Sequence, residues 1–234
     1  MKKVFRIMRF DPEKDPKPRY VDYEVDVDEE MTVLDVLHEI KAKQDGSLSF
    51  RRSCRSAICG SCAMNIAGKN RLACNTQVVK LKKDLITIRP LNGFRIIKDL
   101  VVDFDTFFRK LEKVIPYMIS KTPPPERERL QSPEDFKKYE QFTMCILCGS
   151  CTSSCPSLWF NSEYLGPAAF VKAYRFYADS RDEGKEERLE AVSDESTGVW
   201  RCHVIFNCFD ACPKSIDTTY AINQLKKAAI KGGR

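Results

Sequence analysis

The sequence has no unbroken apolar run of the roughly 18 residues that a membrane-spanning helix requires. Its longest apolar stretches, such as Leu158–Phe160 and Pro167–Val171, are far shorter. We therefore expect no transmembrane segment, so that any attachment to a membrane comes through other subunits. The N-terminus has neither a secretory signal nor a Ser/Arg-rich transit extension, which favours a prokaryotic or a processed protein.

Histidine is scarce, with two residues, and no basic stripe alternates with aromatic side chains, so nucleic-acid binding is not expected. The net charge of +6 comes from interspersed charges. Such a balance is typical of a solvated surface, or of docking to an acidic partner or an anionic membrane. We expect no catalytic Ser/His/Asp or Cys/His set, because metal binding accounts for every cysteine, as follows.

Cysteine is abundant, with eleven residues. An odd number without a secretory signal argues against a disulfide framework and favours metal binding. The first group is Cys54-x4-Cys59-x2-Cys62, followed by Cys74 after eleven intervening residues. This is the spacing of a plant-type [2Fe–2S] site, in which a loop wraps the cluster and a fourth ligand closes it from a neighbouring strand. A structural zinc site is the alternative, although zinc usually uses paired C-x2-C knuckles.

The neighbours of these cysteines suit a cluster. Gly60 and Ser61 allow backbone amides to approach the sulfides, and Arg51, Arg52 and Arg55 bring positive charge that stabilises thiolates.

The second group, Cys145-x2-Cys148-x2-Cys151-x3-Cys155-Pro, matches the bacterial ferredoxin run. In two-cluster proteins the fourth cysteine of such a run serves the other cluster. The partner run is Cys202-x5-Cys208-x3-Cys212-Pro, in which the template expects a cysteine at position 205 and the chain has Ile205. The spacing therefore predicts a [4Fe–4S] cluster on Cys145, Cys148, Cys151 and Cys212, and a [3Fe–4S] cluster on Cys155, Cys202 and Cys208.

This count uses all eleven cysteines. A second [4Fe–4S] cluster with a non-cysteine ligand competes with it, although isoleucine cannot bind iron and would close the empty corner to water. We expect the [3Fe–4S] cluster to be the terminal and comparatively oxidising acceptor.

The pattern along the chain divides it into residues 1–100, an α+β unit, and residues 101–234, a helical unit. The first reads as strand, strand, helix, loop, hairpin and strand, the order of a β-grasp ferredoxin domain. In the second, Thr122–Glu126 is predicted to be an exposed stiff segment and Glu183–Glu190 a charged, solvated helix or loop. The expected strands are Val4–Phe10, Tyr20–Val27, Ala63–Ala67, Arg71–Cys74 and Leu85–Arg89, with a turn at residues 68–70; the expected helices follow the capping pair Thr32 and Asp35, and cover Phe104–Ile115, Ala168–Tyr177 and Thr218–Ile230.

Together these motifs resemble the iron–sulfur subunit of succinate dehydrogenase and fumarate reductase, over essentially the whole chain. Further matching segments are 49–55 (SFRRSCR), 59–65 (CGSCAMN), 166–169 (GPAA), 173–176 (AYRF) and 179–182 (DSRD).

The resemblance implies an α+β protein with a β-grasp plant-type [2Fe–2S] domain and an all-α bacterial-ferredoxin-like domain. It implies a partner flavoprotein with covalent FAD that interconverts succinate and fumarate, in the tricarboxylic acid cycle and respiratory chain. Electrons would run from flavin through [2Fe–2S], [4Fe–4S] and [3Fe–4S] to a quinone, held against one or two hydrophobic anchor subunits. The chain would then be peripheral on the cytoplasmic face of the plasma membrane.

On the quinone side the resemblance implies Pro156, Ser157, Trp159, Phe160, His203 and Ile205. Phe160 stands where many members have a second tryptophan, and it cannot donate an indole N–H hydrogen bond. The residues leave open ubiquinone or menaquinone, and succinate oxidation or the reverse fumarate reduction. A thiol-linked relative, a free ferredoxin-like carrier and a zinc-binding interaction module are the remaining alternatives.

Overall fold

The computed structural model describes residues 1–232. The chain forms two compact units: one comprises Met1–Phe104 and Ile146–Ser154, and the other comprises Asp105–Cys145 and the chain from Cys155 onward. The segment Ile146–Ser154, which carries two cysteines of the second group, thus packs with the first unit. The domain limits 1–100 and 101–234 stay a prediction.

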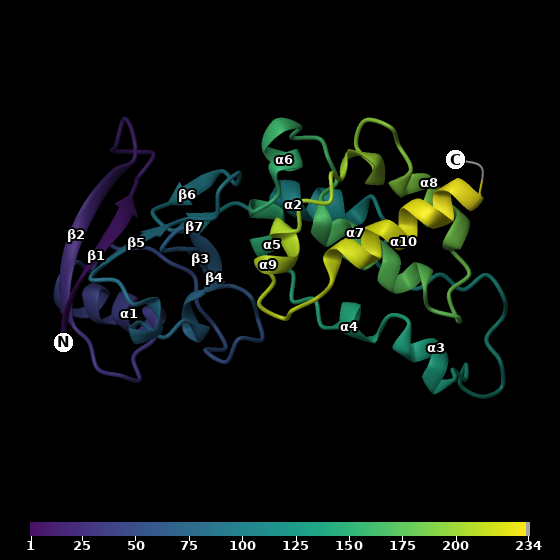
Figure 1. Cartoon of the computed structure of the whole chain (residues 1–234), viewed down its shortest axis with the longest axis horizontal. Coiled ribbons are helices and arrows are strands. Elements are labelled where there is room, and N and C mark those ends of the chain that lie inside the picture. Colours follow the sequence, from purple (N-terminus) through teal and green to yellow (C-terminus); the bar gives the residue numbers. More distant parts are fainter. Residues whose placement is uncertain (233–234) are drawn as a thin grey trace. The chain divides into compact units, whose positions relative to one another are not determined.

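The first unit is built on a five-stranded sheet in the order β2-β1-β5-β3-β4 (Figure 1). β1 pairs antiparallel with β2 and parallel with β5, and β3 and β4 form a hairpin. The strands are β1 (Lys2–Arg9), β2 (Arg19–Asp26), β3 (Ala63–Ile66), β4 (Lys69–Leu72) and β5 (Leu85–Arg89), with a separate pair β6 (Ile96–Lys98) and β7 (Val101–Val102). The sheet and the helix between its strands confirm the β-grasp prediction.

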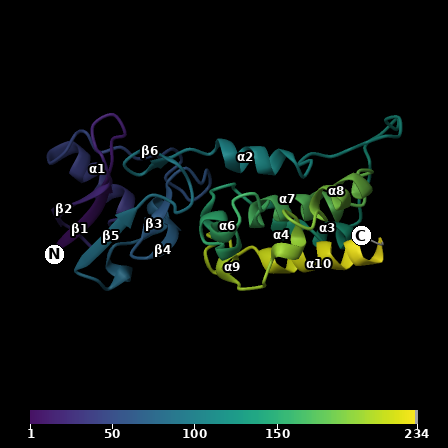
Figure 2. The same ribbon diagram turned by 90° about the horizontal axis from the view of Figure 1, so that it is seen from above.

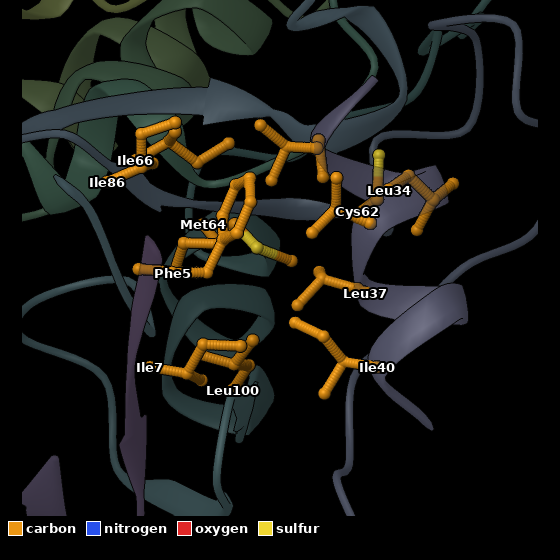
Figure 3. Packing of buried hydrophobic residues seen from close by; sticks show 14 of the residues in the cluster. Phe5, Ile7, Leu34, Leu37, Ile40, Cys62, Met64, Ile66, Ile86 and Leu100 are labelled. Atoms are coloured by element: carbon orange, nitrogen blue, oxygen red, sulfur yellow. The ribbon is translucent and has the colours of Figure 1, made fainter. Parts of the chain in front are cut away.

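Alternation along β1 explains the core of this unit. Phe5 and Ile7 are buried on one face of the strand, while Val4, Arg6 and Met8, which alternate with them, are partly exposed. Helix α1 (Val33–Lys43) begins with the predicted capping box, since Thr32 and Asp35 bond to each other's backbone N–H groups. Its apolar face, including Leu37, meets the sheet residues (Figure 3).

The hairpin is tighter than predicted. Ile66 pairs with Lys69, so the turn consists of Ala67 and Gly68 alone. Both have positive φ, 52° and 91°, as a two-residue primed turn requires. Alanine gave no signal for this conformation, and the predicted turn at residues 68–70 is wrong for that reason.

The second unit is helical, and α10 lies along α7 and α8 in both views (Figures 1 and 2). The predicted helices over Ala168–Tyr177 and Thr218–Ile230 are confirmed as α7 and α10, and α2 is shorter than predicted. No described helix has the length and apolar character needed to cross a bilayer. The helices are α2 (Asp105–Glu112), α3 (Pro133–Lys137), α4 (Glu140–Thr143), α6 (Pro156–Phe160), α7 (Pro167–Tyr177), α8 (Lys185–Val192), α9 (Asn207–Asp210) and α10 (Thr218–Lys231), while α5 (Ser150–Ser153) belongs to the first unit.

Two expectations for this unit are corrected. The predicted helix over Phe104–Ile115 ends at Glu112, and Ile115 has a positive φ of 53°. The charged segment 183–190 is not fully solvated, because Arg188 is 0% exposed. Its guanidinium pairs with Asp182 at 2.9 Å and donates to the carbonyl oxygen of Ile115 at 3.1 Å.

We predict that Asp182→Asn lowers the free energy of unfolding by about 3 kcal/mol, because it leaves the charge of Arg188 buried without its partner. Urea unfolding of the cluster-loaded chain measures this. As a control, Glu190→Gln at an exposed position of α8, the helix that carries Arg188, should change the free energy of unfolding by less than about 0.5 kcal/mol. Equal stability of the two variants would contradict the assigned role of the pair.

Asp179 gives a pH-dependent contribution. Burial opposes its charge, but hydrogen bonds from Arg181 at 2.9 and 3.0 Å lower the pKa of Asp179 to about 2. Since this folded-state pKa lies below the unfolded value of about 3.9, the stabilisation is complete above that value. It is lost as pH falls through the folded pKa.

The loss of stability between about pH 4 and pH 2 should therefore be shallower in Asp179→Asn, as measured by urea unfolding at each pH. The exposed Glu126→Gln is the control and should keep the slope of the unaltered chain. A slope that Asp179→Asn leaves unchanged would show that this carboxylate is not responsible.

Candidate metal centres

The first cysteine group lies in the loop between α1 and β3, with its fourth member just after β4. Three backbone N–H groups, of Ser56, Ile58 and Cys59, point at the sulfur of Cys54 from 3.4, 3.3 and 3.2 Å. These hydrogen bonds favour the thiolate and lower the pKa of the Cys54 thiol to about 6. The loop thus prepares Cys54 to act as a metal ligand.

Cys62 has the opposite environment. It is buried in the core beside Leu34 and Leu37 (Figure 3), and burial raises the pKa of its thiol to about 12. A thiolate at this position requires a nearby positive charge to offset the loss of solvation. Iron would supply that charge, so this donor suits a metal centre better than a free thiol.

The backbone of this loop turns through left-handed conformations. Arg55 and Ala57 both have φ of 57°, and Gly60 has φ of 74°. Left-handed residues among right-handed ones direct successive N–H groups inward, which makes a concave site for anions such as sulfide. Gly60 was singled out from the sequence, but Arg55 and Ala57 carry no local signal for this strained conformation.

Gly60 also lies against the second cysteine group. A Cβ atom placed there would come within 2.8 Å of the Cβ of Cys148 and 2.9 Å of the carbonyl oxygen of Ile146. Asn70 of β4 fixes the same segment, donating to the carbonyl oxygen of Ser150 at 3.2 Å and to the Ser154 hydroxyl at 2.7 Å. Cys148 therefore packs directly on the first cysteine loop, within one unit.

The same backbone feature marks the second group. Leu147 and Gly149 have φ of 54° and 77°, on either side of Cys148. Cys145, in the helical unit, has its carbonyl oxygen 3.4 Å from the ammonium of Lys172.

In the helical unit, the three cysteines assigned to the [3Fe–4S] cluster line one pocket. Cys155, Cys202 and Cys208 converge on it, although the last two are separated from the first by over 45 residues of chain. Ile205 lies in the same lining and is 50% exposed. The place that the template gives to a fourth cysteine is therefore an apolar side chain at the mouth of the pocket.

The predicted quinone-side residues divide into two sets. Pro156, Ser157, His203 and Ile205 line this pocket. Trp159 and Phe160 are not in its lining, and Phe160 is 95% exposed. These two aromatic side chains stand on the surface of α6.

Burial sets the chemistry of these thiols. It raises the pKa of Cys208 to about 11 and also raises the pKa of Cys155. The loop carrying Ile205 turns through Val204 and Phe206, whose φ values are 56° and 67°. As at the first site, buried sulfur ligands and left-handed turns suit a cationic cluster.

Three residues near this pocket carried no clear signal in the sequence. Lys226 of α10 donates to the carbonyl oxygen of Cys202 at 2.8 Å, and Lys110 of α2 donates to that of Tyr164 at 2.9 Å. Tyr164 is 1% exposed and lies in the pocket lining.

Within residues 1–232 all cysteines are free thiols, and no three His, Cys, Asp or Glu side chains are close enough to ligate one metal ion. A mononuclear zinc site would need four ligand atoms at about 2.0–2.3 Å from one centre. Ligands of a multi-atom cluster stand farther apart, since the cluster's own atoms fill the middle.

Comparison with known proteins agrees with these features. A family model described as a 2Fe-2S iron-sulfur cluster binding domain matches residues 4–109, and one described as a 4Fe-4S dicluster domain matches residues 134–216. The succinate dehydrogenase iron-sulfur subunit of Coxiella burnetii is 44% identical, with 97% of each chain covered. That of Paracoccus denitrificans is 46% identical, covering 97% of this chain and 87% of the relative.

Among solved structures, the Mycobacterium smegmatis Sdh1 complex in the apo form has a chain that matches with a TM-score of 0.86. The two are 26% identical in sequence, and the match covers 98% of this chain and 96% of that one.

A β-grasp unit with a plant-type cysteine loop and a helical unit with two interleaved ferredoxin motifs define a multi-cluster electron-transfer protein. The matches to curated relatives identify the family within this class. The chain belongs to the succinate dehydrogenase iron–sulfur subunits. It carries [2Fe–2S], [4Fe–4S] and [3Fe–4S] clusters and relays electrons as a membrane-associated, peripheral part of a complex with other subunits. The dicarboxylate chemistry is not its own.

The close approach at Gly60 gives a testable prediction. Gly60→Ala should lower the free energy of unfolding by more than about 2 kcal/mol and reduce assembly of the [2Fe–2S] cluster. The new methyl group would collide with the segment at Ile146 and Cys148, and alanine would also be strained at this positive φ. The [2Fe–2S] EPR signal per chain is the measurement.

Gly68→Ala is the matched control, since Gly68 also has positive φ but nothing lies within 4 Å of the position that its new methyl group would take. It should cost only the conformational strain, about 1–2 kcal/mol, and keep the full signal. If both variants assemble the cluster equally, the contact with Cys148 has no role in the site.

Proposed function

We propose that the cysteines divide among the clusters as their spacing indicates. Convergence of Cys155, Cys202 and Cys208 on one pocket, with Ile205 beside them, is the single observation that supports this division most strongly. Three sulfur donors and an aliphatic neighbour fit a cluster with three irons. The proposed ligands are Cys54, Cys59, Cys62 and Cys74 for [2Fe–2S], Cys145, Cys148, Cys151 and Cys212 for [4Fe–4S], and Cys155, Cys202 and Cys208 for [3Fe–4S].

The proposed partners are a flavoprotein with FAD, one or two hydrophobic anchor subunits and a quinone. When bound, the clusters supply one-electron transfer from the flavin through [2Fe–2S] and [4Fe–4S] to [3Fe–4S] and the quinone. The chain's own residues hold each centre at a fixed place and exclude water from its buried ligands. Packing of Cys148 against Gly60 supports a short path between the first two centres.

The pocket mouth supports the quinone side of the proposal. The His203 side chain is exposed beside Cys202, and its ring nitrogens can hydrogen-bond to a quinone oxygen. Ser157 donates its hydroxyl hydrogen to the carbonyl oxygen of Arg201 at 2.9 Å, which ties the start of α6 to the segment that precedes Cys202. We assign the quinone to the surface formed by these residues together with Pro156, Trp159, Phe160 and Ile205.

The same end of the helical unit supports docking to a membrane anchor. Trp159, Phe160, Val204, Phe206 and Phe209 are large apolar side chains that stand exposed there. Exposed apolar groups of this size mark interaction surfaces. The proposed location is the cytoplasmic face of the plasma membrane, with succinate oxidation as the reaction of the complex and quinol-driven fumarate reduction as the reverse alternative.

Ile205→Cys tests the ligand assignment. A cysteine at the mouth of the pocket adds a fourth thiolate, so the three-iron cluster should become a four-iron cluster of lower potential. EPR redox titration of the purified complex measures the change, with the oxidised three-iron signal expected to disappear. Ile205→Val is the control and should keep that signal. An unchanged three-iron signal in Ile205→Cys would overturn the assignment of this position.

A further inference from the structure

Tyr164 occupies an unusual position for a phenol. It lies on the segment between α6 and α7, is 1% exposed, and lines the pocket formed by Cys155, Cys202 and Cys208. Burial and the nearby sulfurs of Cys202, Cys155 and Cys208 both raise the pKa of the Tyr164 phenol, so its hydroxyl keeps its proton. A phenol in the lining of a thiolate pocket can donate its O–H to sulfur.

Packing alone does not account for the hydroxyl. The Tyr164 ring contacts that of Phe170 at a centroid distance of 5.5 Å, a contact that phenylalanine would make equally well. A buried phenol oxygen needs a hydrogen-bond partner. The cysteine sulfurs in the same pocket lining are the candidate acceptors for this hydroxyl.

The segment carrying Tyr164 is held at several points. Its N–H donates to the carbonyl oxygen of Asn161 at 3.2 Å, and the next residue, Leu165, donates to that of Thr197 at 2.9 Å. Lys110 donates from its ammonium to the carbonyl oxygens of both Ser162 and Tyr164. The ammonium therefore anchors the backbone from which the phenol enters the pocket, and it adds a positive charge on the same side.

We propose that the Tyr164 hydroxyl donates a hydrogen bond to the Cys202 thiolate, and that Lys110 positions it, so that the pair raises the reduction potential of the three-cysteine centre. This inference rests on the proposed ligand assignment. Reduction adds one electron, delivered by the relay, and breaks no bond; the phenol keeps its proton. Donation to sulfur stabilises the more negative, reduced centre more than the oxidised one. Tyr164 and Lys110 are positioning residues and take no part in a bond-making step.

Tyr164→Phe in the purified complex is the direct test, since it removes the oxygen and keeps the ring. EPR redox titration should show a lower midpoint potential of the three-iron signal than in the unaltered complex. After assembly in D2O, pulsed ENDOR should show one fewer exchangeable deuteron coupled to that signal. Tyr117→Phe, at a 63% exposed phenol, is the matched control and should change neither measurement.

Lys110 provides a second, independent variant. Lys110→Gln should lower the same midpoint potential, and Lys110→Arg, which keeps charge and donors, should restore most of it. The two Lys110 variants test the proposed effect on the reduction potential even if Tyr164→Phe assembles poorly.

Unchanged potential and unchanged deuteron coupling in Tyr164→Phe, or an unchanged potential in Lys110→Gln, would overturn this inference and leave the ligand assignment standing. Absence of a three-iron signal from the unaltered complex would overturn the ligand assignment, and this inference with it.

Discussion

A thiolate is costly to bury unless a positive charge stands beside it, and the structure of this subunit is organised around that cost. Cys62 and Cys208 are placed where burial raises their thiol pKa values to about 12 and about 11. Iron reverses this preference by neutralising the ligand. Metal binding and the final packing of these loops are therefore linked, as they are in other proteins whose ligands are buried.

The backbone conformation of the cysteine loops is also adapted to the clusters. Each cysteine loop contains left-handed residues, such as Ala57, Leu147 and Val204. Such conformations cost of order 1–3 kcal/mol each and persist where the surroundings determine them. Here the surroundings are the packed neighbours of each loop, exemplified by Gly60 against Cys148. Rigid loops keep the centres at fixed places, which a relay requires.

Much of this could be predicted from local sequence signals. Alternation in β1, the capping box of α1 and the cysteine spacings each report a single local rule, and the structure or the family matches confirm the fold and the family. The convergence of three distant cysteines was predicted from the template alone, and the pocket agrees with it. The particular ligand of each cluster stays a proposal.

The features that could not be predicted from the sequence depend on tertiary contacts. Ala67 adopts a left-handed turn conformation that is imposed by the pairing of the strands on either side. Arg188 would be predicted to be a surface charge, and only the structure shows that its partner Asp182 is buried beside it. Attachment of Ile146–Ser154 to the first unit rests on Asn70, whose amide gives no advance sign of it. The same holds for Tyr164, because only the folded chain shows that it is buried in the lining of the cysteine pocket.

The central claim is that eleven thiolates hold three clusters in a division of four, four and three. Mössbauer spectroscopy of the anaerobically purified, iron-57-enriched complex tests it most directly, with metal analysis on the same sample. The division predicts about nine irons per chain, in three classes with areas of about two, four and three. Zinc in place of iron, or areas of about two, four and four, would contradict it.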